Sequence, residues 1–97
     1  MTERELSQAR YLTIELERLR GLEERSAEVA ALIERHTQEV ELARFEVMAY
    51  IATIPDPKIR VIAVMRYLEG KSWETIARRL HYERTSPAKQ LRRFLKK

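Results

Sequence analysis

Residues 3 to 53 contain no proline and a single glycine, so nearly the whole N-terminal half of this 97-residue chain can be helical. Apolar residues recur there at spacings of three and four, which is the period of a helix with one apolar stripe. Proline disfavours helix in the residue before it and cannot continue one, so Ile54-Pro55-Asp56-Pro57 must end the segment. We therefore predict an all-α fold with a helical arm, residues 1 to 54, and a C-terminal unit, residues 55 to 97.

The arm carries an imperfect coiled-coil pattern. Two heptad positions form the apolar seam: residues 12, 19, 26, 33, 40, 47 and 54 occupy the first, and residues 15, 22, 29, 36, 43 and 50 occupy the second. Three residues of the seam are polar, namely Glu15, Ser26 and His36. An unbroken helix of about 50 residues would be about 75 Å long and could not cover its own apolar stripe. The arm therefore needs a partner. We favour a second copy in a coiled-coil dimer; the alternative is a hairpin that bends between Gly21 and Ser26.

The net charge of +4 conceals a division between the two parts. Residues 1 to 54 contain seven Arg and eleven Glu, a net charge of −4, whereas residues 55 to 97 contain twelve Lys or Arg and four acids, a net charge of +8. A basic surface attracts polyanions and an acidic one repels them. We expect the two parts to meet different partners.

The C-terminal unit has the signals of three short helices joined by tight turns. Asp56-Pro57 is a typical cap and first residue for a helix that Gly70 would stop. Ser72 can cap a second helix, WETIARRL. A loop of residues 81 to 85 follows, and Ser86-Pro87 repeats the cap and proline before the last helix. Three helices with tight turns in about forty residues are the outline of a trihelical DNA-binding unit.

The last helix, SPAKQLRRFLKK, has five positive charges and no negative one. Its cations can neutralise phosphates and release counterions, and long donors there can reach base edges in the major groove. A charged face alone is more often merely solvated, but the preceding helix, turn and caps favour contact with double-stranded DNA. The candidate DNA-binding residues at this helix are Thr85, Ser86, Lys89, Gln90, Arg92, Arg93 and Lys96.

Several other functions lack a sequence signal. The chain has no cysteine, and its two histidines, His36 and His81, lie too far apart in sequence to suggest a metal pair. It has no glycine-rich phosphate loop and no nucleophile with a matching His and Asp, so we expect neither an enzyme nor a cofactor. Without a signal-peptide pattern or an apolar run of spanning length, we expect a cytoplasmic protein outside the membrane.

Within residues 51 to 97, the pattern RYLEG-x-SWETIA is followed without a gap by Leu80, Tyr82, Leu91 and the Phe94-Leu95 pair. This segment resembles the helix-turn-helix of bacterial sigma factor region 4, in particular that of small phage and prophage transcription regulators of the RinA and ArpU type. The resemblance implies control of phage genes, commonly late genes, by promoter binding in a bacterial host cell. It implies DNA contacts by Arg84, Thr85, Lys89, Arg92 and Arg93.

Two residues depart from the pattern of those regulators. Glu83 stands where they usually have a serine cap, and Pro87 stands where they usually have a branched apolar residue. Together these changes predict that the last helix begins late, near Ser86, after a longer turn. The reading residues would then be displaced by a few ångström.

The leading hypothesis is a homodimer that joins through the arm and presents two basic helices to paired half-sites in double-stranded DNA. One alternative is a phage DNA-packaging protein similar to a small terminase subunit, although such proteins usually place the DNA-binding part first. A second alternative is a helical module that binds RNA polymerase through the acidic arm.

Overall fold

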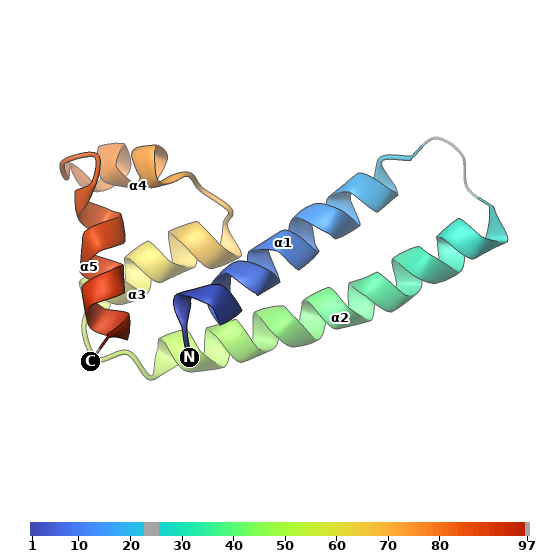
Figure 1. The fold of residues 1–97 in the computed structure, drawn as a ribbon, viewed down its shortest axis with the longest axis horizontal. Coiled ribbons are helices and arrows are strands. Elements are labelled where there is room, and N and C mark those ends of the chain that lie inside the picture. Colours follow the sequence, from blue (N-terminus) through green and yellow to red (C-terminus); the bar gives the residue numbers. More distant parts are fainter. Residues whose placement is uncertain (23–25, 97) are drawn as a thin grey trace.

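The computed structural model describes residues 1–22 and 26–96, and within them all regular structure is helical (Figure 1). The predicted all-α class is confirmed. The elements in chain order are α1 (Glu3–Arg20), α2 (Ala27–Ala52), α3 (Pro57–Ala63), the π-helical turn η1 (Val64–Leu68), α4 (Trp73–Leu80) and α5 (Ser86–Leu95).

The arm is a hairpin in which α1 and α2 lie side by side and run in opposite directions (Figure 1). The first helix ends at Arg20 with Gly21 as its C-cap, and α2 begins after Ser26, whose Oγ accepts a hydrogen bond from the Val29 amide (3.2 Å). Residues 23 to 25 of the predicted bend lie outside the described residues. Of the two paths considered for the arm, the hairpin is the one adopted; an unbroken helix of about 75 Å is excluded, because the longest dimension of the molecule is 46 Å.

The hairpin uses the predicted heptad seam within one chain. Val40 and Val47 of α2 are buried along it. The three polar positions also have partners or roles: Glu15 and His36 meet across the hairpin, with 3.1 Å between the Glu15 carboxylate and His36 Nδ1, and Ser26 caps α2. The apolar stripe that required a partner is thus covered largely by the other half of the same arm.

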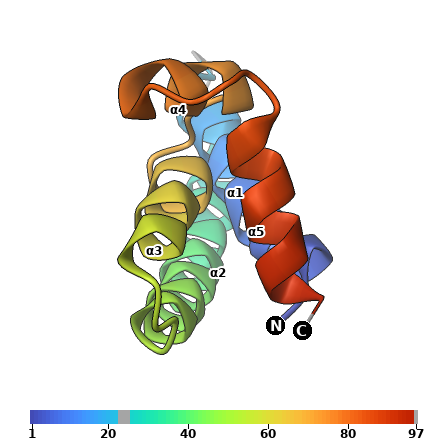
Figure 2. The same ribbon diagram turned by 90° about the vertical axis from the view of Figure 1, so that its left-hand side faces the viewer.

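A single core joins the hairpin to the C-terminal helices (Figure 2). Leu6 at the start of α1 is fully buried, and it belongs to the same cluster as Ile62, Ile76 and Leu91 from three C-terminal helices. Ile54, in the turn after α2, is also in this cluster. The C-terminal helices therefore do not enclose a core of their own but share one with the arm.

The segment predicted as one helix ending near Gly70 is α3 followed by η1. Asp56 caps α3 as predicted, accepting a hydrogen bond from the Lys58 amide (2.9 Å), and Gly70 has the left-handed conformation expected of a stop signal (φ 72°). The π-helical turn was not predicted. It is closed by the bond from the Glu69 amide to the Val64 carbonyl (2.9 Å).

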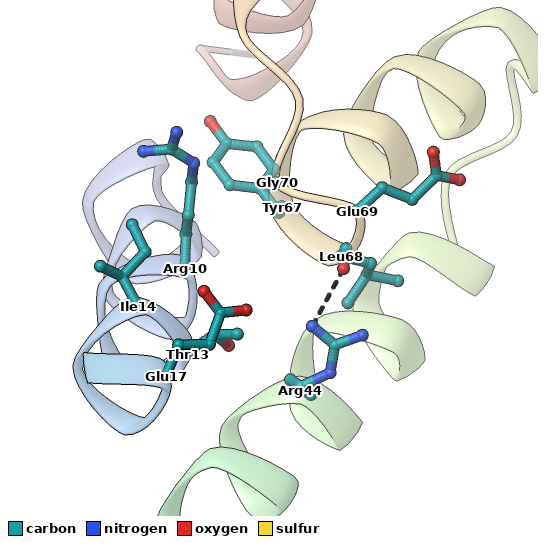
Figure 3. Close-up of a pocket in the computed structure, with 9 residues that line it drawn as sticks. All are labelled: Arg10, Thr13, Ile14, Glu17, Arg44, Tyr67, Leu68, Glu69 and Gly70. Atoms are coloured by element: carbon teal, nitrogen blue, oxygen red, sulfur yellow. Dashed lines mark hydrogen bonds between the residues drawn. The ribbon is translucent and has the colours of Figure 1, made fainter. Parts of the chain in front are cut away.

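The end of η1 is attached directly to the arm. Arg44 of α2 donates from Nη1 to the Leu68 carbonyl (3.0 Å), one of the carbonyls left without a partner where a helix ends (Figure 3). A cavity of about 450 Å³ lies beside this bond, between α1, α2 and η1. Its lining includes charges of both signs: Arg10 and Glu17 on α1, Arg44 on α2, and Glu69 after η1 (Figure 3).

We predict that Leu6→Ala destabilises the whole molecule by about 2–5 kcal/mol, because it opens a cavity in the shared core. Urea unfolding followed by circular dichroism should show one transition at a lower midpoint. The matched control is Leu22→Ala, which alters a leucine that is 47% exposed and should change stability by less than about 0.5 kcal/mol. Equal effects of the two substitutions would contradict a core shared by the arm and the C-terminal helices.

We also predict that stability falls at alkaline pH through Tyr67. Burial raises the pKa of the Tyr67 hydroxyl, and the Glu3 carboxylate raises it further. The folded state then holds this proton more tightly than the unfolded state, so the stabilisation is complete below about pH 10 and is lost as pH rises through the folded pKa. Urea midpoints measured from neutral pH to about pH 11 should fall less steeply for Tyr67→Phe than for the unmodified chain. The matched control is Tyr11→Phe, which removes the hydroxyl of an exposed tyrosine, and an equal effect of the two substitutions would contradict the role of Tyr67.

Candidate nucleic-acid interface

Local signals define the α4–turn–α5 segment. Ser72 caps α4 as predicted, with its Oγ accepting a hydrogen bond from the Thr75 amide (3.1 Å). The helix ends in a Schellman motif in which His81 is left-handed (φ 60°) and the Tyr82 amide donates to the Ala77 carbonyl (2.8 Å). The predicted loop from residue 81 is therefore present.

The last helix begins at Ser86, so its predicted late start is confirmed. The prediction that Ser86 is the N-cap is wrong, because the N-cap lies one residue earlier, at Thr85. The Ser86 amide is already tied to the Glu83 carbonyl (2.9 Å), and Thr85 occupies the cap position without a side-chain capping bond. The Ser86 hydroxyl instead accepts a hydrogen bond from Gln90 Nε2 (2.9 Å).

The two faces of α5 differ sharply in character. Pro87, Ala88 and Leu91 are buried, and the helix packs on α3 and α4 (Figure 2). Helical periodicity turns the charged residues outward. The exposed cations on this outward face are Lys89, Arg92, Arg93 and Lys96. Lys97, also counted among the charges of this helix, lies outside the described residues.

The other candidate residues lie at the margins of this face. Ser86 and Gln90 are half-buried and bonded to each other, which engages part of their hydrogen-bonding capacity. Arg84 and Thr85 are exposed in the turn before α5. The Arg84 guanidinium lies 3.8 Å from the Glu74 carboxylate of α4 and is 79% exposed. The eight predicted residues thus fall into a cationic face, a bonded polar pair and an exposed turn.

One partner of the cationic face comes from the other end of the chain. Arg92 Nε donates to both carboxylate oxygens of Glu3, at 3.1 and 3.2 Å, where the start of α1 lies beside the end of α5 (Figure 2). Both side chains remain about half exposed, at 51% and 40%, so solvent and polyanions can compete for the contact. No local pattern could have revealed this pair, because 89 residues separate its members.

Positive charge continues beyond Arg92 to η1. Arg66 stacks over Trp73, with 4.6 Å from the guanidinium carbon to the ring centroid, and donates from Nη1 to the Lys71 carbonyl (3.2 Å). Burial lowers the pKa of Arg66, and the charges of Arg10 and then Arg92 lower it further. These effects show that three arginines from α1, η1 and α5 share one electrostatic neighbourhood. Sequence reasoning singled out neither residue: no pattern marks Arg10, and Arg66, the first residue of RYLEG, was not among the predicted contacts.

Other kinds of site are not apparent in the described part of the chain. No group of three or more His, Cys, Asp or Glu residues there could hold a metal ion. No helix among residues 1–22 and 26–96 combines the length and apolar character needed to cross a membrane.

Comparison with protein-family models, curated proteins and solved structures finds no match for the chain.

The Glu3–Arg92 pair should restrain binding of polyanions by α5. We predict that Glu3→Gln raises affinity for duplex DNA at low salt by up to about fivefold, because an exposed pair contributes about 0.2–1 kcal/mol. Fluorescence anisotropy with a labelled duplex measures the change. Glu5→Gln alters net charge equally, but Glu5 is exposed and its carboxylate accepts from Thr2 rather than from α5. An equal gain in affinity for duplex DNA from both variants would show that net charge alone causes the effect.

Proposed function

We propose that this protein is a sequence-specific double-stranded DNA-binding transcription regulator that uses α4 and α5 as a helix-turn-helix. The observation that carries the proposal is the outward face of α5, where Lys89, Arg92, Arg93 and Lys96 are exposed and no acidic residue occurs between Ser86 and Leu95. The opposite face is held by α3 and α4. A rigid cationic helix of this kind is suited to the major groove.

The dimensions and chemistry of α5 support this use. A helix with its side chains is about 10–12 Å across and the major groove is about 12 Å wide, so the ten residues of α5 can lie in it. Lysine and arginine on the exposed face suit phosphate contacts, which position a protein on DNA. Arg93 and Gln90, on one side of this face, also have donors suited to guanine and adenine edges. We assign phosphate binding to the whole face and base reading to this side.

The biological target follows from the sequence resemblance. RYLEG-x-SWETIA and the apolar residues after it resemble the motif of RinA- and ArpU-type regulators, which supports promoter DNA of phage or prophage late genes as the target. Sigma-like units also touch the transcription machinery, so contact with RNA polymerase is part of the proposal. The acidic hairpin is the surface available for that contact.

We predict that Lys89→Ala weakens duplex binding and reduces the slope of log affinity against log salt by about 1, since one phosphate contact is lost. Gel-shift titrations over a salt series measure both quantities. The matched control is Arg35→Ala, which removes an exposed cation from α2 near the hairpin tip. DNA binding that is insensitive to salt, or equally weakened by the two substitutions, would refute the role of α5.

Sequence specificity has a separate test. Purified protein incubated with fragments of the genome that encodes it should retain a small set of sites, and Arg93→Ala should relax the preference within them. Retention of promoter fragments supports regulation. Enrichment of a packaging site, together with a ring of many copies in light scattering, would instead support the DNA-packaging alternative.

A further inference from the structure

The hairpin leaves an apolar strip uncovered on the outer side of α2. Leu42, Phe45 and Met48 are 61%, 68% and 53% exposed, and they follow one another at the three-residue spacing that places side chains on one side of a helix. Ala49 and Ala52 are exposed on the same side. A contiguous exposed apolar patch on a small protein commonly marks an interaction site.

The strip continues onto α3. Ile51, one turn after Met48, lines a hollow together with Pro57, Val61 and Val64. Pro57 and Val61 also line a second hollow that reaches Leu80 and Tyr82. Val61 is 44% exposed between the two hollows. We call this surface the α2–α3 apolar face; its members are Leu42, Phe45, Met48, Ala49, Ala52, Pro57 and Val61.

Charges of opposite sign lie at the two ends of this face. Because α3 runs back along the last turns of α2, the start of α3 lies near the end of α2 (Figure 1). Lys58 is exposed at that end. The other end carries the exposed Glu41, one turn before Phe45. Arg60 and Glu69 line the hollow between the two ends, and Arg60 donates to the Ile54 carbonyl (2.7 Å). Asp56 at the basic end is occupied in capping α3.

We propose that the α2–α3 apolar face binds the same face of a second copy of this chain, about a twofold axis that passes close to Met48 and Val61. A twofold contact turns the face end for end, so the acidic end of each copy meets the basic end of its partner. Glu41 of one copy is then opposite Lys58 of the other. Burial of Phe45, Leu42 and Met48 provides the apolar centre of the contact.

The proposed contact leaves the cationic face of α5 open. Ile59 of α3 lines a hollow with Gln90, Arg93 and Phe94, so it lies on the side of α3 that α5 covers. Val61 is two residues further along and therefore about 200° around the helix axis. The dimer surface and the outward face of α5 are accordingly on different sides of α3. This inference does not rest on the proposed DNA binding.

The proposed dimer thus uses a different surface of the arm from the dimer predicted from the heptad pattern. That pattern placed the contact along residues 12 to 54, but much of the seam is buried between α1 and α2. The exposed residues that remain apolar on α2, such as Leu42 and Phe45, belong to neither heptad position of the seam.

The first test is the oligomeric state of the full chain without DNA, measured by sedimentation equilibrium over a range of concentrations. We expect a reversible dimer, and we expect Phe45→Glu to raise its dissociation constant at least tenfold while circular dichroism remains unchanged. Leu22→Glu is the matched control, because it also charges an exposed leucine, at the hairpin tip. The proposal would be overturned if the chain stayed monomeric at every concentration or if the two variants had equal effects on the dissociation constant. A chain that is always monomeric would indicate that the face binds a different protein.

Two further variants test the twofold arrangement. Glu41→Lys and Lys58→Glu should each weaken the dimer, and the double variant should restore it, because the exchanged charges again face each other. The chain has no cysteine, so Met48→Cys should cross-link to its partner on mild oxidation, whereas Leu22→Cys should not. A dimer that shows neither charge rescue nor Met48→Cys cross-linking uses another surface. Duplex binding by Phe45→Glu, assayed separately, distinguishes failure of this proposal from failure of the proposed function.

Discussion

Burial of the first turns of α1 against α2 and the C-terminal helices is the contact on which the rest of the structure depends. About forty residues rarely enclose enough apolar surface to fold alone, and here Leu6 and Ala9 enter the same core as Ile76 and Leu91. Val47 and Ile51 of α2 complete it. Since α5 rests on this core through Leu91, the position of its charged face depends on the arm.

The same packing determines the electrostatic surroundings of α5. It brings the Glu3 carboxylate onto Arg92 and places Arg10 near Arg66, although these residues are distant in sequence. The acidic arm and the basic C-terminal part are therefore in direct contact where α1 begins. The arm thus supplies a carboxylate that competes with polyanions for Arg92.

Much of the local structure could be predicted because its causes lie within a few residues. Asp56 and Ser72 cap their helices, and Gly70 takes the conformation that L-residues disfavour. The late start of α5 followed from Glu83 and Pro87 in the same way. The cap at Thr85 and the π-helical turn were missed, because each depends on backbone hydrogen bonds that side-chain preferences do not specify.

The amino-acid sequence by itself determined that the chain is helical, where the C-terminal helices begin, and which face of α5 is cationic. These properties follow from helical periodicity and capping, which act over one or two turns. The tertiary structure alone decided how the apolar stripe of the arm is covered and which residues approach α5. A heptad pattern states only that a stripe needs a partner, and α1 and α2 satisfy that need within one chain. Contacts such as Glu3 with Arg92 depend on how whole helices pack, so they have no local signature.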